Sequence, residues 1–354
     1  MTLISFNLLS NLTFAIIYTC VLIMFTIGLN MIYSVLKFSN FAHAEWVTAG
    51  LYFSWWVSQV LYHMLPTDLD FYINNIFIHA ALTFILVGSL GIVFEILVFS
   101  KLRLSKANAT SLTVATIGVG FVIRYLLAII FGDSPQRGAN YDNKPYFPSI
   151  IPELFREERY NIELFFRDPI FGTESINFTN YHLYLVIIAI VMVIAIDLMF
   201  RYTRFGIALR ATSDSMELAQ VSGINTKRIV YYTWFLAAGI TGFAATLYRP
   251  TVGNFNNFTG FYLLLPIFAV VILGGVGSFR GGIIAAIIIG FTRQFATVLI
   301  SELKKDGLGK FINDNVITLA PQYADGIGFI ILIIVLLYRP QGIMGSVDST
   351  RARV

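Results

Sequence analysis

Long runs of hydrophobic residues recur along the chain and alternate with short polar stretches. A bilayer core about 30 Å thick is crossed by about 20 apolar residues in a helix. Runs of that kind lie near residues 11–36, 41–64, 76–99, 111–131, 182–200, 229–248, 261–275, 281–300 and 323–338. The pattern predicts an all-α, polytopic integral membrane protein with about 8–10 transmembrane helices, built as a single domain over residues 1–354.

The composition agrees with a protein whose main solvent is lipid. Hydrophobic types make up 57% and charged types 12% of the chain, and the mean hydropathy is +0.74. Soluble domains carry about 25% charged residues, so too few polar side chains remain here for a water-facing surface. A soluble enzyme and a disordered chain are therefore excluded. The single cysteine, Cys20, excludes an internal disulfide and a cysteine-based zinc site, and no metal or nucleic-acid site is predicted.

Positive charge in the short loops predicts the orientation of the spans. Residues 100–110 carry three bases and no acid, and residues 201–228 carry five bases against two acids. The positive-inside rule places both loops, and the C-terminal tail, in the cytoplasm and the N-terminus outside. On the outer side, residues 132–181 form an insertion loop with eight acids and five bases. That loop is equally compatible with a cap over a pathway and with a decoration of the surface.

The loop 201–228 contains a stretch, Phe205 to Val221, with helical periodicity. Its apolar positions are Phe205, Ala208, Leu209, Met216 and Ala219, and its polar positions are Arg210, Ser213, Asp214, Glu217 and Gln220. Gly223 follows at a position suited to a C-terminal cap. A short amphipathic helix of this kind either lies on the lipid surface or docks into a partner, and composition alone favours the lipid surface.

Several motifs resemble the permease subunits of bacterial and archaeal ABC importers for branched-chain amino acids. RYTRFGIALRATSDSMELAQVSGINTKRI (201–229) is similar to the coupling loop of that family, with Gln220 and Val221 as departures. Four further matches in family order are GLNMIYSVLKFSNFAHAEW (28–46), FEILVFSKLR (94–103) followed by LTVATIGVGF (112–121), FAVVILGGVGSFRGGIIAAIIIG (268–290) and LLYRPQGIMG (336–345). The matches leave 132–181 as the main uncovered segment.

The resemblance implies a multi-pass protein of the prokaryotic cell membrane. It implies a pathway between this chain and a second homologous permease subunit, in a homodimer or a heterodimer. An extracytoplasmic substrate-binding protein would deliver the cargo, and two cytoplasmic ATPase subunits would bind ATP and magnesium. This chain would itself hold no cofactor. It also implies that the coupling loop inserts into the ATPase through Arg204, Phe205, Arg210, Asp214, Glu217 and Gly223.

Two groups of residues are candidates for the substrate pathway. Asn40, Phe41, His43 and Glu45 open the second predicted span, where charge is expensive and usually faces a cavity or a partner. A wet position at the membrane boundary explains them equally well. The glycines Gly274, Gly275 and Gly277 lie in GGVGSFRGG, which favours a tight turn between two helices. Those glycines either let helices pack closely or expose backbone groups to a substrate.

Other ionisable residues within the spans have simpler interpretations. Glu95 is expected to pair with Lys101 or Arg103, and Asp197 with Arg201 one helical turn away. Two arginines, at 124 and 293, lie deeper in predicted spans, and the sequence assigns no partner to either.

Alternatives to an amino-acid importer remain open at this point. Urea and short-amide permeases share these motifs, and no side chain separates a zwitterion with an apolar tail from a small neutral amide. An ion-coupled carrier would more often place acids at the middle of the membrane, whereas here they cluster near the boundaries. A membrane enzyme would need a catalytic constellation, which four scattered histidines do not offer. No phosphate-binding loop of the Walker type is present either.

Overall fold

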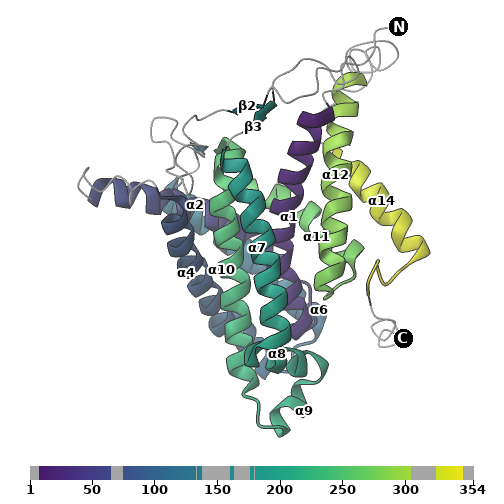
Figure 1. Ribbon diagram of the computed structural model, residues 1–354. Coiled ribbons are helices and arrows are strands. Elements are labelled where there is room, and N and C mark those ends of the chain that lie inside the picture. Colours follow the sequence, from purple (N-terminus) through teal and green to yellow (C-terminus); the bar gives the residue numbers. More distant parts are fainter. Residues whose placement is uncertain are drawn as a thin grey trace.

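A computed structural model shows a bundle of long helices (Figure 1). It describes residues 8–64, 75–132, 134–137, 160–162, 176–178, 180–303 and 324–345. Within these residues every predicted apolar run overlaps a helix. These helices are α1 (Leu8–Leu36), α2 (His43–Met64), α4 (Ile76–Phe94), α6 (Ala109–Phe131), α7 (Asn180–Tyr202), α10 (Thr226–Val252), α11 (Thr259–Gly274), α12 (Phe279–Leu303) and α14 (Ala324–Tyr338).

The helices confirm an all-α polytopic membrane protein. In the described part of the chain, six helical segments are long and apolar enough to cross a membrane, and they correspond to α1, α4, α6, α7, α10 and α12. The other predicted spans form shorter apolar helices in α11 and α14, and a 22-residue helix of lower hydrophobicity in α2. The C-terminal turns of α2 project from one side of the bundle in Figure 1.

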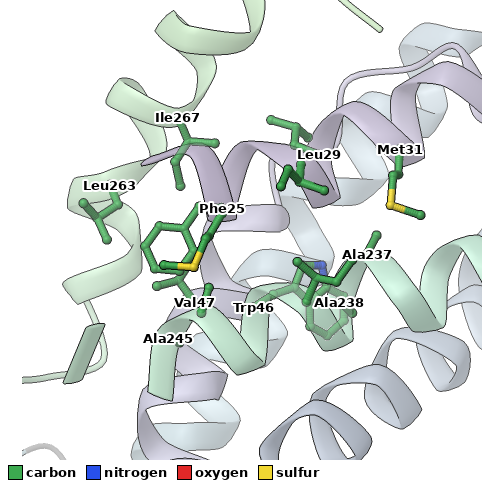
Figure 2. Packing of buried hydrophobic residues seen from close by; sticks show 14 of the residues in the cluster. Phe25, Leu29, Met31, Trp46, Val47, Ala237, Ala238, Ala245, Leu263 and Ile267 are labelled. Atoms are coloured by element: carbon green, nitrogen blue, oxygen red, sulfur yellow. The ribbon is translucent and has the colours of Figure 1, made fainter. Parts of the chain in front are cut away.

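The core is built around α1 and α10, which are the most buried of the six apolar segments. Helix α10 packs against α4, α1 and α2, and α1 also packs against α12, α7 and α11. Figure 2 shows the resulting cluster, in which side chains from these helices meet the small residues of α10, Ala237, Ala238 and Ala245. Small residues let membrane helices approach closely: a Cβ added to Gly50 would lie 2.9 Å from the Cα of Gly242.

The segment predicted as a span at 76–99 extends further than expected. Helix α4 continues through a π-helix, η2 (Glu95–Phe99), into α5 (Ser100–Leu104). Apolar periodicity does not distinguish a π-turn from α-helix, because the chain stays helical and only the hydrogen-bond step changes. The end of this span at residue 99 was therefore predicted five residues too early.

Two small ribbons lie in the loops. Strand β1 (Gln136–Arg137) pairs antiparallel with β4 (Asn254–Phe255), and β2 (Tyr160–Ile162) pairs antiparallel with β3 (Ile176–Phe178). Three of these strands belong to the insertion predicted at 132–181, most of which lies outside the described residues. Its role therefore stays a prediction.

The coupling loop contains two helices, α8 (Arg204–Asp214) and α9 (Met216–Val221). The expectation of one continuous helix from Phe205 to Val221 was wrong. The helices are separated by Ser215, whose extended backbone (φ −153°, ψ 115°) ends α8 and begins α9. Its hydroxyl accepts a hydrogen bond from the Leu218 N–H, as serine does at helix N-termini.

Candidate substrate pathway and coupling helices

The connection between α1 and α2, residues 37–42, is non-helical and largely buried. A buried non-helical connection has to satisfy its backbone polar groups within the protein. Here α6 supplies a partner, since the N–H of Phe41 donates to Thr116 Oγ1 at 3.0 Å. The ring of Phe41 stacks on Phe268 of α11, with centroids 4.6 Å apart and planes 7° apart.

Asn40 lies within this connection and is fully buried, with 0% of its surface exposed. Neither its amide nitrogen nor its amide oxygen has a hydrogen-bond partner among the described residues. A buried amide without partners costs free energy, and such groups in native proteins usually serve a ligand or hold water. The side chain is thus equipped to donate to, and accept from, a polar group that enters the protein.

His43 begins α2 and links three helices. Its Nε2 lies 2.8 Å from the carbonyl oxygen of Phe25 on α1 and 3.2 Å from the hydroxyl of Thr241 on α10. Because the Phe25 carbonyl oxygen can only accept, a neutral His43 ring carries its proton on Nε2 and donates it to Phe25, while the Thr241 hydroxyl donates to the Ala237 carbonyl. The ring is held against Gly28, whose added Cβ would lie 2.8 Å from His43 Cε1.

Glu45, two residues further along α2 and therefore on another side of the helix, forms an ion pair with Arg124 of α6. A second hydrogen bond joins Arg124 Nε to Glu45 Oε1 at 3.1 Å, and the Thr48 hydroxyl lies 3.3 Å from Glu45 Oε2. The same hydroxyl accepts the N–H of Gly260 at 3.0 Å, which connects the pair to α11. Aromatic rings surround the guanidinium, with that of Phe261 centred 4.6 Å away.

These contacts correct the wet-boundary interpretation of the second span. Asn40, His43 and Glu45 are at most 2% exposed, so none of them is hydrated at a membrane surface. They also do not converge, because Phe41 points to α11, His43 to α1 and α10, and Glu45 to α6. Their assignment to a substrate pathway stays a prediction, and Asn40 carries its strongest geometric support.

The other ionisable residues of the spans are mostly paired. Glu95 pairs with Arg103, one of its two predicted partners, and Asp197 pairs with Arg201 at 2.9 Å as predicted. The sequence assigned no partner to Arg124 because its carboxylate lies 79 positions away, on another helix. Arg293, the other arginine without an assigned partner, stacks its guanidinium over the Tyr18 ring at 4.2 Å.

The glycine-rich segment forms the predicted tight turn between α11 and α12. The backbones touch where a Cβ on Gly274 would lie 2.5 Å from the carbonyl carbon of Gly281. Gly275 and Gly277 have φ of +96° and +83°, a conformation that favours glycine. These contacts give Gly274 and Gly275 a packing role, and a role in a substrate pathway stays a prediction.

Two segments distant in sequence secure this turn. The amide of Asn30 on α1 accepts the N–H of Gly277 at 3.3 Å, and the Ser34 hydroxyl donates to its carbonyl at 3.2 Å. On the other side, the N–H of Ile343 donates to the Leu273 carbonyl at 2.8 Å, so the C-terminal segment packs on the end of α11.

Helices α8 and α9 form one tip of the molecule (Figure 1). Thr203 caps α8 by accepting the Gly206 N–H at 3.0 Å, and Gly223 ends α9 with φ +83° as predicted. The N–H of Ile224 bonds the carbonyl of Ala219, and that of Gly223 bonds Gln220, which is the Schellman pattern of a helix end. The tip therefore has a defined shape of its own.

The side chains of the coupling loop divide between the bundle and the exterior. Leu209 and Ala219 are buried against the other helices, and Phe205 is half-buried beside Tyr232. The remaining residues predicted to couple to a partner are all exposed: Arg204, Arg210, Asp214, Glu217 and Gly223. The structure therefore brings the predicted coupling residues onto one tip, on two helices rather than one.

These features define the class of the molecule. The chain is a multi-pass membrane protein whose glycine-rich core helices pack closely and whose paired α8 and α9 project from one end of the bundle. Among the described residues no group of three or more histidine, cysteine, aspartate or glutamate side chains is arranged to hold a metal ion.

Comparison with known proteins identifies the family. The model for "Branched-chain amino acid transport system / permease component" matches residues 11–336, and the chain belongs to this family. It is 24% identical over 322 residues to the high-affinity branched-chain amino acid transport system permease protein LivH of Salmonella typhimurium, covering 90% of this chain and 89% of the relative. BraD of Pseudomonas aeruginosa is 23% identical, with 90% of each chain covered. A probable LivH of Methanocaldococcus jannaschii is 25% identical, over 94% of this chain and 90% of the relative. No solved structure matches.

Proposed function

We propose that this chain is the membrane-spanning permease subunit of an ATP-driven importer that carries branched-chain or other hydrophobic amino acids into a prokaryotic cell. A second homologous permease completes the pathway, two ATPase subunits bind ATP and magnesium, and an extracytoplasmic binding protein delivers the cargo. Membership of the permease family supports this assignment, as do the relatives described as branched-chain amino acid permeases.

The observation that carries the coupling role is the exposed surface of α9. Leu218 and Val221 are 69% and 87% exposed, beside the exposed Glu217. Large apolar side chains gathered on a polar tip mark a site that another surface covers. A helix with apolar residues and one flanking carboxylate fits a cleft in a partner protein. We therefore assign α9 to the ATPase rather than to the lipid surface that composition alone favours.

Contacts between distant loops support the proposed orientation. The Nζ of Lys37 lies 3.3 Å from the hydroxyl of Ser213 on α8, and Phe38 stacks on Phe99 next to α5. The basic loops 100–110 and 201–228 thus adjoin the same end of the bundle. With the positive-inside rule, this end and the C-terminus are cytoplasmic and the N-terminus is outside.

The cargo assignment draws on the surroundings of Asn40. The stacked pair of Phe41 and Phe268 offers an apolar surface next to a buried amide with free hydrogen-bonding capacity. A hydrophobic amino acid has an apolar side chain and polar backbone groups that match this combination. Urea and short amides match the amide alone, and a direct comparison of uptake separates the two cargoes.

The experiment compares Glu217→Lys with Glu217→Gln in the complete transporter. The tagged chain is purified from its native membrane with its partners, which mass spectrometry identifies, and is reconstituted for uptake of labelled leucine and urea. Reversing an interfacial charge costs about 2 kcal/mol or more, so we expect Glu217→Lys to lower ATP-driven leucine uptake about 30-fold, with a smaller loss for Glu217→Gln. Both variants should keep the melting temperature of the isolated chain, since Glu217 is exposed.

Three results would each contradict a part of the proposal. Full ATP-driven uptake by Glu217→Lys would remove the coupling role of α9. Purification of the chain without any ATPase, together with uptake that survives ATP depletion, would favour an ion-coupled carrier. Uptake of urea in place of leucine would leave the coupling role intact and replace the cargo.

A further inference from the structure

A cavity of about 430 Å³ opens at the α8 end of the bundle. It lies between α1, α7, α8 and the turn from α11 to α12, with Met344 of the C-terminal segment at its edge. Liquid water occupies about 30 Å³ per molecule, so the cavity has room for a group of about a dozen non-hydrogen atoms. It is distinct from the buried region around Asn40, none of whose residues line it.

The charged lining of this cavity is unbalanced. Three arginines, Arg201, Arg210 and Arg280, line it with one acid, Asp197. Asp197 is engaged by Arg201, with Arg201 Nε 2.9 Å from Asp197 Oδ2. Neither Arg210 nor Arg280 forms an ion pair within the part of the chain that the structure describes. Two guanidinium groups therefore share one cavity without a carboxylate to neutralise them.

Serine and asparagine residues also line the cavity. Ser278 and Ser213, two and three positions from the two free arginines, line the cavity together with Asn30 of α1. Guanidinium groups bind phosphate through two parallel N–H donors, and the Ser278 hydroxyl adds a further donor, whereas the Ser213 hydroxyl already donates to the Ser34 carbonyl at 2.7 Å. Carboxylates, by contrast, would repel such a ligand, and the one present is already paired.

The walls beside the cavity are apolar and exposed. On α7, the residues Ile190, Ile194 and Leu198, which precede Arg201, are 48–54% exposed. On α12, Ile287, two turns after Arg280, is 45% exposed. Figure 1 shows α7 and α12 on either side of α1, in agreement with the contacts of both helices with α1. In a membrane protein such surfaces face acyl chains. In a ligand with an anionic head and apolar tails, the head would lie in the cavity and the tails would lie along α7 and α12.

We propose that this cavity binds the phosphate of an anionic phospholipid headgroup through Arg210 and Arg280. Basic pockets between membrane helices hold such headgroups, because the membrane surface keeps their phosphates at the depth of the arginines. Free phosphate offers the same oxyanion without tails, and the exposed walls of α7 and α12 favour the lipid. The site shares Gly277 with the candidate substrate pathway and Arg210 with the predicted coupling residues, but no residue of α9 lines it.

The test uses the full-length protein in lipid nanodiscs of phosphatidylcholine with an increasing fraction of phosphatidylglycerol. Native mass spectrometry counts the phosphatidylglycerol molecules retained on the protein. Each basic residue near an anionic surface contributes about 1 kcal/mol, so we expect Arg280→Gln to weaken retention about fivefold. Arg280→Lys, which keeps the charge, should lose less. The matched control is Arg228→Gln, an exposed arginine outside the cavity, which should retain lipid as the parent does.

A second arm separates the two phosphate sources. Inorganic phosphate is titrated by calorimetry into protein in pure phosphatidylcholine nanodiscs. The lipid site is supported if Arg280→Gln retains less phosphatidylglycerol than the parent and Arg228→Gln, and the protein does not bind inorganic phosphate. Phosphate binding that depends on Arg280, without lipid retention, replaces the lipid by a free anion. Equal retention by the parent, Arg280→Gln and Arg228→Gln overturns the site.

Discussion

The buried ion pair between Glu45 and Arg124 allows a sharp test of the packing of α6. Arg124→Gln leaves the Glu45 carboxylate, which is 2% exposed, with only the Thr48 hydroxyl as a side-chain partner. Breaking a buried pair by removing one member costs about 3–5 kcal/mol, because the remaining charge is uncompensated. The variant also loses the contact of the guanidinium with the Phe261 ring, which adds about 0.5–2 kcal/mol.

The assay is thermal unfolding of the purified chain in mild detergent, followed by tryptophan fluorescence. At about 2–4 °C per kcal/mol, a loss of about 4 kcal/mol lowers the melting temperature by about 10 °C. Exposed Arg228→Gln is the matched control and should change the free energy of unfolding by less than about 0.5 kcal/mol.

A double variant tests whether the effect belongs to the pair. Because Glu45→Gln removes the uncompensated charge, the combination with Arg124→Gln should be no less stable than Arg124→Gln alone. The reasoning is refuted if Arg124→Gln has the same melting temperature as the Arg228→Gln control. It is also refuted if the losses of stability in Arg124→Gln and Glu45→Gln simply add in the double variant.

Two further predictions concern the pathway and the glycine turn. Asn40→Leu should raise the KM for leucine uptake about tenfold, by removing a hydrogen bond of about 1.4 kcal/mol to substrate. The same variant should keep or raise the melting temperature, since it removes a buried amide without partners; a lower melting temperature with normal uptake would mean a structural role. Gly281→Ala should lower the melting temperature by several degrees because its Cβ would collide with the Gly274 carbonyl, whereas Gly118→Ala, with open space, should not. Equal melting temperatures for these two variants would refute the close contact of α11 and α12.

Local patterns in the sequence predicted most of the helices. Runs of apolar residues gave the spans because the bilayer imposes one length on every helix that crosses it. Asp197 and Arg201 were paired correctly because four residues bring side chains together on any helix. Gly223 was placed at a helix end for a similarly local reason.

The sequence did not predict features that depend on contacts between distant segments. The pairing of Glu45 with Arg124 requires α2 and α6 to lie side by side, and no periodicity carries that information. The stacking of Phe41 on Phe268 is missed for the same reason. The break at Ser215 had a local signal, the polar run Thr212 to Ser215, but the apolar periodicity on both sides concealed it.

The buried connection between α1 and α2 has a consequence for the synthesis of the chain. Its backbone groups depend on later helices, since Thr116 of α6 supplies the acceptor for the N–H of Phe41 and Phe268 of α11 covers its ring. While the ribosome is still producing α6, residues 37–42 have neither partner. This connection therefore reaches its final contacts only after α6 and α11 have been made, although both helices that flank it are made first. The N–H of Phe41 gains its acceptor from a threonine that lies 75 positions further along the chain.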